Sequence, residues 1–420
     1  MASHTALRDR EMTYRLIISQ LFYDGYSNLA VQLSNVIKAQ PACPPSDRLI
    51  GIVKLGLEAE GNKREDTTIS CVAPGTGLDL EFETEVQRIS SEVATYETCY
   101  VTSHKGPCRS ATYHPSGQVV ATGSEDSSIK VLDVERMLAK SLDNIDPNER
   151  EAHPVIRTLY DHSEEVSTLQ FHPTSPLLFS GSFDCTIKVF EYTKPSVKRS
   201  SKCIQEAFAV KSISLHPSGD YMLAGTEHPT IRLYDATTFQ CYSTSSALDQ
   251  HRGPITEVKF SPKGNLFATA SMDGDIKVWD GVSGRCVSTF KSAHDSVPVS
   301  SVQFSRNSKY ILSSGLDSVV RLWELSTSRL LIAYTGAGTT GRQECHTNAT
   351  FNHTEDFALF PDEQSRSLCS WDARNADRQR LLATGHAQPV RVVCHSPTGP
   401  ALMTCSDDHR ARFWYRNADI

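Results

Sequence analysis

Short runs of alternating apolar and polar residues recur along the chain from about residue 95 to its end, and turn-forming residues separate them. In one stretch, Ile255, Val258 and Phe260 precede the turn Ser-Pro-Lys-Gly at 261–264, and Leu266 begins the next apolar run. Short alternating runs bounded by Pro, Gly, Asn and Asp predict antiparallel strands joined by hairpins. The pattern therefore predicts a mainly β region over residues 95–420.

A longer unit repeats seven times within this region. Each copy has a His or its substitute, apolar runs, a polar turn around Asp, and an apolar run that ends in Trp or its substitute. The last positions align as Leu132, Phe190, Tyr234, Trp279, Trp323, Trp371 and Trp414. They are separated by 58, 44, 45, 44, 48 and 43 residues. This period and signature resemble those of WD-repeat proteins, and the resemblance implies a seven-bladed WD-repeat β-propeller.

The resemblance also implies a buried hydrogen-bonded network in each well-preserved copy, formed by the His, a Ser or Thr, the Asp and the Trp. The three copies with all four residue types supply His251, Thr269, Asp273 and Trp279; His294, Ser313, Asp317 and Trp323; and His386, Thr404, Asp408 and Trp414. A Ser, a His and an Asp together would also suit hydrolase chemistry. A buried network that satisfies its own polar members favours the structural interpretation. We therefore predict no catalytic residues and no enzyme activity.

Two copies depart from this pattern. The third has Glu206 at the His position and His228 at the Asp position, and the sixth has Ser365 at the Asp position. Blades that lack the network can persist because their neighbours bury their faces. The segment YETCYV at 96–101 precedes the first His, so we expect it to form the outer strand of the last blade and to close the ring.

Two segments exceed the standard repeat and are candidate binding loops. The first, 137–152, lengthens the first interval and is expected between the third and fourth strands of its blade. The second, 335–345, lies between the fifth and sixth copies and contains TGAGTTG. This glycine-rich stretch lacks the Lys-Ser/Thr of a phosphate-binding loop. None of the 12 Cys residues is spaced CxxC, so we predict no metal site and no cofactor.

Residues 7–39 have helical rather than strand periodicity, within a helical domain predicted over residues 1–60. Leu29, Leu33, Val36 and Ile37 share one face of a helix, and Asp24-Gly25 is expected to end a preceding helix over about 8–23. The string LIISQLFYDGYSNLAVQL resembles the LisH dimerisation motif, which implies a small all-α dimerisation domain. A domain this small rarely buries its own apolar faces. The residues predicted to form the dimer contact are Leu16, Ile17, Leu21, Phe22, Tyr26, Leu29 and Leu33. The alternative is that these helices pack on the propeller of their own chain.

Residues 61–94 are interpreted as an acidic linker. Its apolar residues Leu78, Leu80 and Phe82 could dock on the propeller or on a partner, although such a stretch is more often solvated. With three basic and seven acidic residues, the linker has a net charge of −4 out of −7 for the whole chain. The remaining −3 falls on the propeller, so no field for binding phosphates is expected. The basic patch KPSVKRSSK could touch RNA, but we expect RNA contact to be weak or indirect at most. No apolar stretch is long enough to span a membrane, and the first residues are too charged for a signal peptide.

A closer resemblance extends from residue 16 to 416. LIISQLFYDGY, VAPGTGLDLEF, YETCYVTSHKGPCR, HPVIRTLYDH, NSKYILSSG, YTGAG, FNHTEDF and TCSDDHRARFWYR are similar to the family of fifty-kilodalton subunits of the cleavage stimulation factor. The resemblance implies a nuclear, homodimeric scaffold in pre-mRNA 3′-end cleavage and polyadenylation that associates with the 77 kDa subunit. An alternative stays open, because WDAR at 371–374 resembles an element of WD-repeat substrate receptors of cullin-based ubiquitin ligases.

Overall fold

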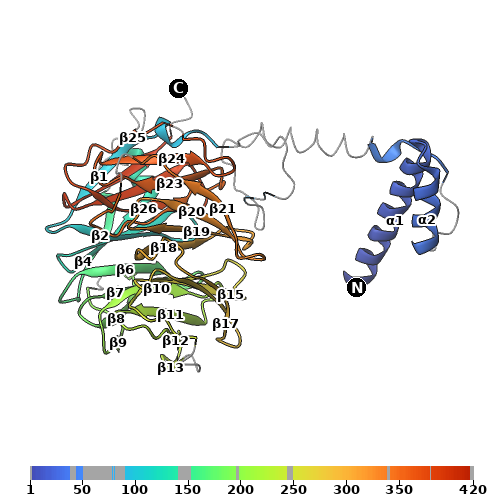
Figure 1. Ribbon diagram of the computed structural model, residues 1–420. Helices are drawn as coiled ribbons and strands as arrows, with labels where there is room; N and C mark the ends of the chain where they lie inside the picture. The colour runs from blue at the N-terminus through green and yellow to red at the C-terminus, as the bar shows by residue number, and fades with distance from the viewer. Residues whose placement is uncertain are drawn as a thin grey trace. The chain divides into compact units, whose positions relative to one another are not determined.

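The computed structural model describes residues 2–37, 44–50, 78, 80, 90–140, 153–194, 198–243, 249–337, 341–378 and 380–416. The chain divides into two compact units, Met1–Ser70 and Cys71–Ile420. The first unit is helical and the second consists mainly of strands (Figure 1).

The helical unit contains a hairpin of two helices, α1 (Ala2–Tyr23) and α2 (Ser27–Ile37). Gly25 ends α1 with φ at +85°, a conformation that residues with a Cβ rarely adopt. The N–H of Tyr26 donates to the carbonyl of Leu21 at 2.9 Å, and the N–H of Gly25 donates to that of Phe22 at 3.3 Å, which is the Schellman arrangement. The predicted turn is confirmed, but α1 begins six residues before the predicted start at about residue 8.

A third segment continues the helical unit. The Ser46 hydroxyl accepts a hydrogen bond from the N–H of Arg48 at 3.2 Å, as expected for a residue that caps a helix, and residues 48–50 are helical. The N–H of Ser46 donates to the carbonyl of Ser19 in α1 at 3.1 Å, which fixes the segment to the hairpin. The sequence after Pro44-Pro45 predicts a third helix with Leu49, Ile52 and Val53 on one face, and Ile52 and Val53 lie outside the described residues.

The second unit is a seven-bladed propeller, each blade a four-stranded antiparallel sheet, as predicted. Blade 1 comprises β2 (Cys108–Tyr113), β3 (Val119–Ser124), β4 (Ser128–Asp133) and β5 (Val155–Tyr160). Blade 2 comprises β6 (Val166–Phe171), β7 (Leu177–Ser182), β8 (Thr186–Glu191) and β9 (Lys202–Gln205). Blade 3 comprises β10 (Val210–Leu215), β11 (Tyr221–Thr226), β12 (Arg232–Asp235) and β13 (Cys241–Ser243).

The remaining blades follow in chain order. Blade 4 comprises β14 (Ile255–Phe260), β15 (Leu266–Ser271), β16 (Ile276–Asp280) and β17 (Cys286–Phe290). Blade 5 comprises β18 (Val299–Phe304), β19 (Tyr310–Gly315), β20 (Val320–Glu324) and β21 (Leu330–Tyr334). Blade 6 comprises β22 (Thr350–Phe351), β23 (Phe357–Pro361), β24 (Ser367–Asp372) and β25 (Leu382–Ala383). Blade 7 comprises β26 (Val390–His395), β27 (Ala401–Ser406), β28 (Arg410–Tyr415) and β1 (Glu97–Ser103).

The last blade joins the two ends of the propeller. Strand β1 pairs antiparallel with β28, with Thr98 opposite Trp414 and Ser103 opposite Arg410. The predicted closing strand at 96–101 is therefore confirmed, one to two residues later in the chain. Because the closing strand comes from the other end of the repeat array, it covers the edge of β28 and joins the two ends of the ring.

Apolar side chains fill the space between neighbouring blades. Phe179 and Ile187 of blade 2, for example, belong to the same buried cluster as Val210 and Met222 of blade 3. Each blade therefore covers the face of the next, and this packing accounts for the persistence of blades 3 and 6, whose polar networks are incomplete.

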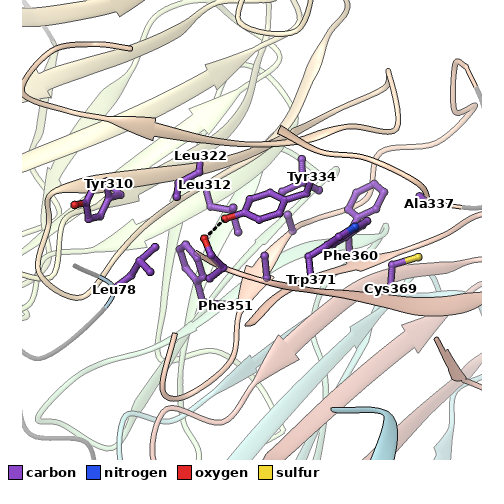
Figure 2. Packing of buried hydrophobic residues seen from close by; sticks show 14 residues of the cluster. Leu78, Tyr310, Leu312, Leu322, Tyr334, Ala337, Phe351, Phe360, Cys369 and Trp371 are labelled. Atoms are coloured by element: carbon purple, nitrogen blue, oxygen red, sulfur yellow. Dashed lines mark hydrogen bonds between the residues drawn. The ribbon is translucent and has the colours of Figure 1, made fainter. Parts of the chain in front are cut away.

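The linker contacts the propeller at Leu78, whose side chain is fully buried. Figure 2 shows Leu78 beside Tyr310, in the cluster between blades 5 and 6. Its N–H donates to Glu355 Oε2 at 2.8 Å, and Asn307 Nδ2 donates to its carbonyl at 2.6 Å. The N–H of Leu80 donates to the Tyr310 hydroxyl at 3.0 Å. Of the two possibilities left open for the linker, docking on the propeller therefore holds at Leu78, where the apolar side chain and both backbone groups find partners, while Phe82 lies outside the described residues.

Candidate functional site

The four residues of each predicted network lie together. In blade 4, His251 Nδ1 lies 3.0 Å from Asp273 Oδ2, and His251 Nε2 lies 2.7 Å from Thr269 Oγ1. Trp279 Nε1 donates to the same Thr269 oxygen at 2.9 Å. The strand order explains the meeting, because Thr269 and Trp279 lie on the paired strands β15 and β16 while the Asp lies in the turn between them.

Blades 5 and 7 repeat this geometry. In blade 5 the His294 ring contacts Asp317 at 2.9 Å and Ser313 at 2.8 Å, and Trp323 Nε1 donates to Ser313 at 2.9 Å. In blade 7 the corresponding distances are 2.9 Å from His386 to Asp408, 2.9 Å to Thr404, and 3.0 Å from Trp414 to Thr404.

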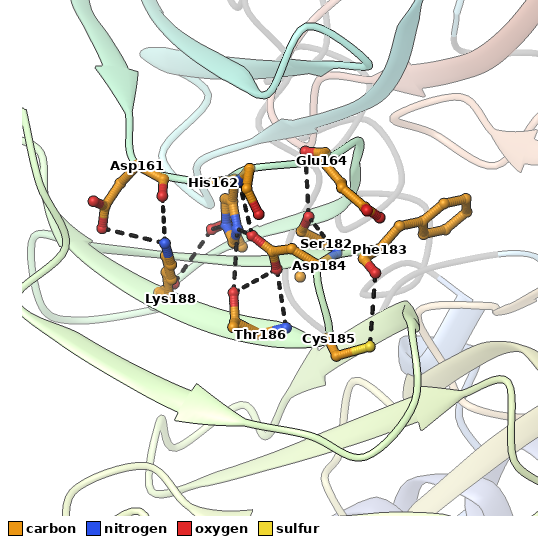
Figure 3. Close-up of polar contacts among 12 residues, drawn as sticks. Asp161, His162, Glu164, Ser182, Phe183, Asp184, Cys185, Thr186 and Lys188 are labelled. Carbon is orange, nitrogen blue, oxygen red and sulfur yellow. Dashed lines mark hydrogen bonds and ion pairs between the residues drawn. The ribbon is translucent and has the colours of Figure 1, made fainter.

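Blades 1 and 2 contain partial networks that the candidate residues did not include. In blade 2, His162 contacts Asp184 at 2.8 Å (Figure 3). It also contacts Ser180 at 2.7 Å, and Phe190 occupies the position of the Trp. In blade 1, Ser128 lies 2.9 Å from His104 Nδ1, and the Asp126 carboxylate is at 3.7 Å. The His-to-Asp spacing of 22 residues is the sequence signal for both.

The network carboxylates are held in their ionised form. Burial by itself would raise the pKa of Asp273. The hydrogen bond and charge of His251, with the N–H groups of Arg252 and Asp275, outweigh burial and hold this pKa well below its ordinary value. The pKa of Asp317 and that of Asp408 are lowered in the same way by their His partners, again against the effect of burial.

These networks resemble Ser–His–Asp triads in connectivity but differ in access. The hydroxyl-bearing residues Thr269, Ser313 and Thr404 are fully buried. Each hydroxyl also accepts the indole N–H of its blade, so no space is left beside it for a reacting carbonyl. The geometry therefore favours a structural role.

The degraded blades replace the network with other contacts. In blade 3, Tyr234 donates a hydrogen bond to Glu206, and Arg232 Nε lies 3.2 Å from the other oxygen of this buried carboxylate. In blade 6, Trp371 Nε1 donates to the carbonyl of Thr335 in the preceding loop at 2.9 Å. The Glu206 carboxylate and the Trp371 indole thus have partners where the His or the Asp is missing.

The helical hairpin exposes much of its apolar surface. Tyr26 is 58% exposed and Leu29 is 56% exposed. The other five predicted dimerisation residues, Leu16, Ile17, Leu21, Phe22 and Leu33, are partly buried. Among the side chains of the hairpin that the structure describes, the fully buried ones are instead Ile18 and Ala30. The seven predicted residues are therefore available to a further partner on a single chain.

Comparison with known proteins identifies both units. Residues 5–61 match the family model of the cleavage stimulation factor subunit 1 dimerisation domain. Residues 96–133, 154–191 and 379–415 match the WD domain, G-beta repeat, and residues 196–340 match the Vps8 beta-propeller. "Cleavage stimulation factor subunit 50" of Arabidopsis thaliana is 36% identical over 412 residues, which cover 95% of this chain and 94% of that protein. This chain belongs to the cleavage stimulation factor subunit 50 family. The resemblance found in the sequence is thereby confirmed.

Relatives outside the cleavage stimulation factor subunit 50 family match a smaller part of the chain. COMPASS component SWD3 of Saccharomyces cerevisiae is 27% identical over 202 residues, which cover 47% of this chain and 58% of that protein. Pre-mRNA-processing factor 19 of Bos taurus is 30% identical over 166 residues, which cover 38% of this chain and 28% of that protein.

Both inserts of this family member are described in part. The first follows β4 and begins with α4 (Val134–Ala139), whose start is capped by Asp133, a carboxylate that accepts from the N–H of Arg136 at 3.1 Å. Residues 141–152 lie outside the described residues, and β5 follows as the fourth strand, as predicted. In the second insert, Arg378 Nη1 donates to the carbonyl of Gly336 at 2.6 Å, and residues 338–340 are outside the described part.

Other candidate chemistries receive no support from the described part of the chain. Its residues include no group of three or more His, Cys, Asp or Glu side chains suited to a metal ion. Its helices are all too short or too polar to cross a bilayer.

Proposed function

We propose that this chain is a non-enzymatic scaffold subunit of the nuclear cleavage stimulation factor, acting in pre-mRNA 3′-end cleavage and polyadenylation through protein–protein contacts and homodimerisation. The observation that carries the proposal is the match of nearly the whole chain to a cleavage stimulation factor subunit, together with the separate match of residues 5–61 to a dimerisation domain. The exposed Tyr26 and Leu29 supply apolar surface for a second copy.

The buried hydroxyls of the polar networks support the non-enzymatic part of the proposal. A nucleophile must reach its substrate, and the three candidate hydroxyls are each enclosed between a His ring and an indole. We assign the twelve network residues to the stability of blades 4, 5 and 7.

Protein partners are favoured over RNA. The 77 kDa subunit of the cleavage stimulation factor is the proposed main partner, because this chain belongs to the same factor by family. In the basic patch, Lys194 is paired with Glu191 at 2.6 Å, whereas Lys198 and Arg199 are exposed on one short loop and Lys202 is exposed at the start of β9. Three exposed cations on a propeller of net negative charge give a small electrostatic footprint, so RNA contact would be weak or indirect.

The cullin-ligase alternative loses its main support at Arg374. This Arg of the WDAR element forms an ion pair with Asp356 at 3.0 Å, and the Asp356 side chain is 2% exposed. An Arg held by a buried carboxylate of its own blade is poorly placed to bind an adaptor, since release would leave that charge unpaired.

Co-purification of the tagged full-length chain from nuclear extract, followed by cross-linking mass spectrometry, tests the proposal. We expect subunits of the 3′-end processing machinery, with cross-links to the 77 kDa subunit. A variant with Arg374→Ala should recover the same set. Recovery of a cullin adaptor in place of these subunits, lost on Arg374→Ala, would reject the scaffold assignment.

A further inference from the structure

The mouth of the central channel is a cavity of about 650 Å³. The first strands of the blades, such as β2, β6, β10 and β14, contact one another in sequence around the centre. In six blades the pairing between the first and second strands skips the second residue of the first strand, as in a β-bulge. These six residues are Arg109, Ser167, Lys211, Thr256, Ser300 and Arg391, and all line the cavity.

A small side chain with a hydroxyl group is compatible with the propeller fold at the second residue of the first strand. Ser167 Oγ donates to the carbonyl of Val210 at 2.5 Å, and Thr256 Oγ1 donates to that of Val299 at 2.7 Å, each in the next blade. Because blades 2 and 4 are satisfied in this way, the long cationic side chains in blades 1, 3 and 7 are not required by the propeller. Comparison with Ser167 and Thr256 at the equivalent positions therefore indicates that Arg109, Lys211 and Arg391 have a role other than stabilising the propeller.

The cations of the mouth already have partners. Arg109 Nη1 pairs with Asp407 Oδ1 at 2.5 Å, and Arg391 Nε donates to Asp407 Oδ2 at 2.7 Å. Lys211 Nζ lies 2.9 Å from Glu227 and 4.0 Å from the centre of the Phe183 ring. An anionic ligand would have to compete with these carboxylates for each cation.

Carboxylates are in excess at the same mouth. The cavity lining has the three cations Arg109, Lys211 and Arg391 and, in equal number, the acids Glu165, Glu227 and Glu344. Three further acids, Glu125, Asp407 and Glu363, pair with the two arginines from outside the lining, so the lining and its ion-pair partners together give 3 − 6 = −3. Glu165 lies 3.8 Å from Arg109 Nε, beyond hydrogen-bond distance, with its side chain 20% exposed. Burial raises the pKa of Glu165, and the charges of Glu125 and Asp407 add to this effect against those of Arg109 and Lys211. A further cation would relieve this concentration of negative charge.

Two large apolar side chains also line the cavity. Phe183 of blade 2 and Met272 of blade 4 line the same cavity, and Met272 is 43% exposed. Aliphatic stems of long cationic side chains pack on such surfaces, and an aromatic face attracts the charged head. The combination of unmatched carboxylates and these apolar side chains fits a lysine or arginine side chain better than a carboxylate or a phosphate.

We propose that the channel mouth binds a lysine or arginine side chain presented by an extended segment of a partner protein. The charged head is held by Glu165 and Glu344, and the stem packs against Phe183 and Met272. The inference rests on the proposed scaffold function, because it supplies the chemistry by which the propeller selects a protein segment. It also accounts for the weak RNA contact expected of this surface, since phosphates meet net negative charge there.

A peptide library tests the inference. Its central residue is fixed and its flanking residues are random, because the flanking sequence of the partner segment is not specified. Immobilised full-length chain is incubated with nine-residue peptides of random flanking sequence whose centre is Lys, Arg, Gln or Glu, and retained peptides are counted. We expect Lys- and Arg-centred peptides to be retained about tenfold over Gln-centred ones, as for charge pairs at a partly desolvated site. Equal retention of all four sets, or enrichment of Glu-centred peptides, would overturn the inference.

Variants locate the effect within the cavity. Glu165→Gln with Glu344→Gln keeps the shape of both side chains and should abolish the preference for a basic centre. The matched control Glu97→Gln with Glu135→Gln removes the same charge from exposed residues outside the cavity lining and should retain it. Should the double variant fail to fold, Glu344→Gln alone, at an exposed residue, is expected to reduce the preference at least severalfold. Preference unchanged by either channel variant would contradict the assignment.

The two proposals fail separately. If the wild-type chain recovers 3′-end processing subunits from nuclear extract but shows no basic preference in the library, the channel assignment is wrong and the scaffold function stands. If it shows the preference but recovers none of these subunits, the scaffold function is wrong.

Discussion

At the scale of the residue, one buried hydroxyl in each complete polar network contacts both the His ring and the Trp indole. Thr269 Oγ1 contacts both the His251 ring and the Trp279 indole, and therefore joins two strands and the loop that precedes them. The resemblance to WD-repeat proteins implied these partners, and the repeat spacing located them in the chain, because blades 4, 5 and 7 share one strand register. In blade 1 the Ser128 hydroxyl, and not the Asp126 carboxylate, is the nearest partner of His104 Nδ1. This contact was not predictable from the sequence, since it depends on the rotamer of one side chain.

Removal of a network carboxylate should destabilise the propeller. Asp273→Ala deletes a partner of His251 and of two backbone N–H groups, and we expect a loss on the order of 2–4 kcal/mol in the free energy of unfolding. Urea unfolding followed by fluorescence measures this loss. Asp220→Ala, at an exposed turn, is the control and should change stability little. A fully stable Asp273→Ala protein would contradict the structural role.

Two stacked histidines predict a dependence of stability on pH. The rings of His353 and His395 lie 5.2 Å apart at an interplanar angle of 12°. Burial, with the charge of Arg306, lowers the pKa of His353 to about 4; burial and the neighbouring His353 lower that of His395 to about 3. Tyr96 and Asp356 also face the pair, and Asp356 opposes the shift of His353.

Both histidines are thus neutral in the folded protein over a range in which the unfolded chain, with a pKa of about 6.5, binds protons. Their contribution is complete above about pH 6.5 and is lost as the pH falls toward the folded values, by at most about 1.4 kcal/mol per pH unit for each group. We expect urea midpoints to fall between pH 7 and pH 5, and His353→Phe to flatten the fall. An identical pH profile in wild type and variant would exclude this account.

At the scale of the element, short signals in the local sequence predict where helices end and which strands pair. Asp24-Gly25 predicted the end of α1, and the repeat predicted the closing strand β1. The helix α4 was not predicted although Asp133 is a suitable capping residue, because six residues are too few to show a clear helical period. The docking of Leu78 could not be predicted, since its partners Asn307 and Glu355 are more than 200 residues away in the chain.

At this scale we predict that a charge at position 78 detaches the linker from the propeller. Leu78→Asp would place an unpaired carboxylate in the apolar cluster between blades 5 and 6, at a cost of several kcal/mol, so the segment should undock. Hydrogen exchange should then show at least about tenfold faster exchange of the amides of residues 78 and 80, since each tenfold corresponds to about 1.4 kcal/mol. Val282→Asp, at a side chain that is 93% exposed, is the control. Unchanged protection in Leu78→Asp would show that the segment is held elsewhere.

The whole molecule combines a small helical unit with a large rigid ring. The number of blades was readable from a period that survives even in degraded copies. The chemistry of the channel mouth was not, because Arg109, Glu165, Met272 and Arg391 belong to four different blades and meet only when the ring closes. A dimer of such chains would present two propellers, and binding to a dimeric partner would then gain from effective concentration.

The molar mass of the full-length chain in solution tests the central claim, that this protein is a dimeric scaffold joined through its helical unit. Light scattering during size-exclusion chromatography should give twice the chain mass of 46.4 kDa. Leu29→Asp with Leu33→Asp should give the mass of one chain with an unchanged melting temperature for the propeller, because charges on the apolar face oppose burial. Asn28→Asp with Asn35→Asp adds the same charges to α2 at exposed polar positions and should stay dimeric. A wild-type chain of single mass, or a Leu29→Asp, Leu33→Asp variant that remains a dimer, would contradict the account.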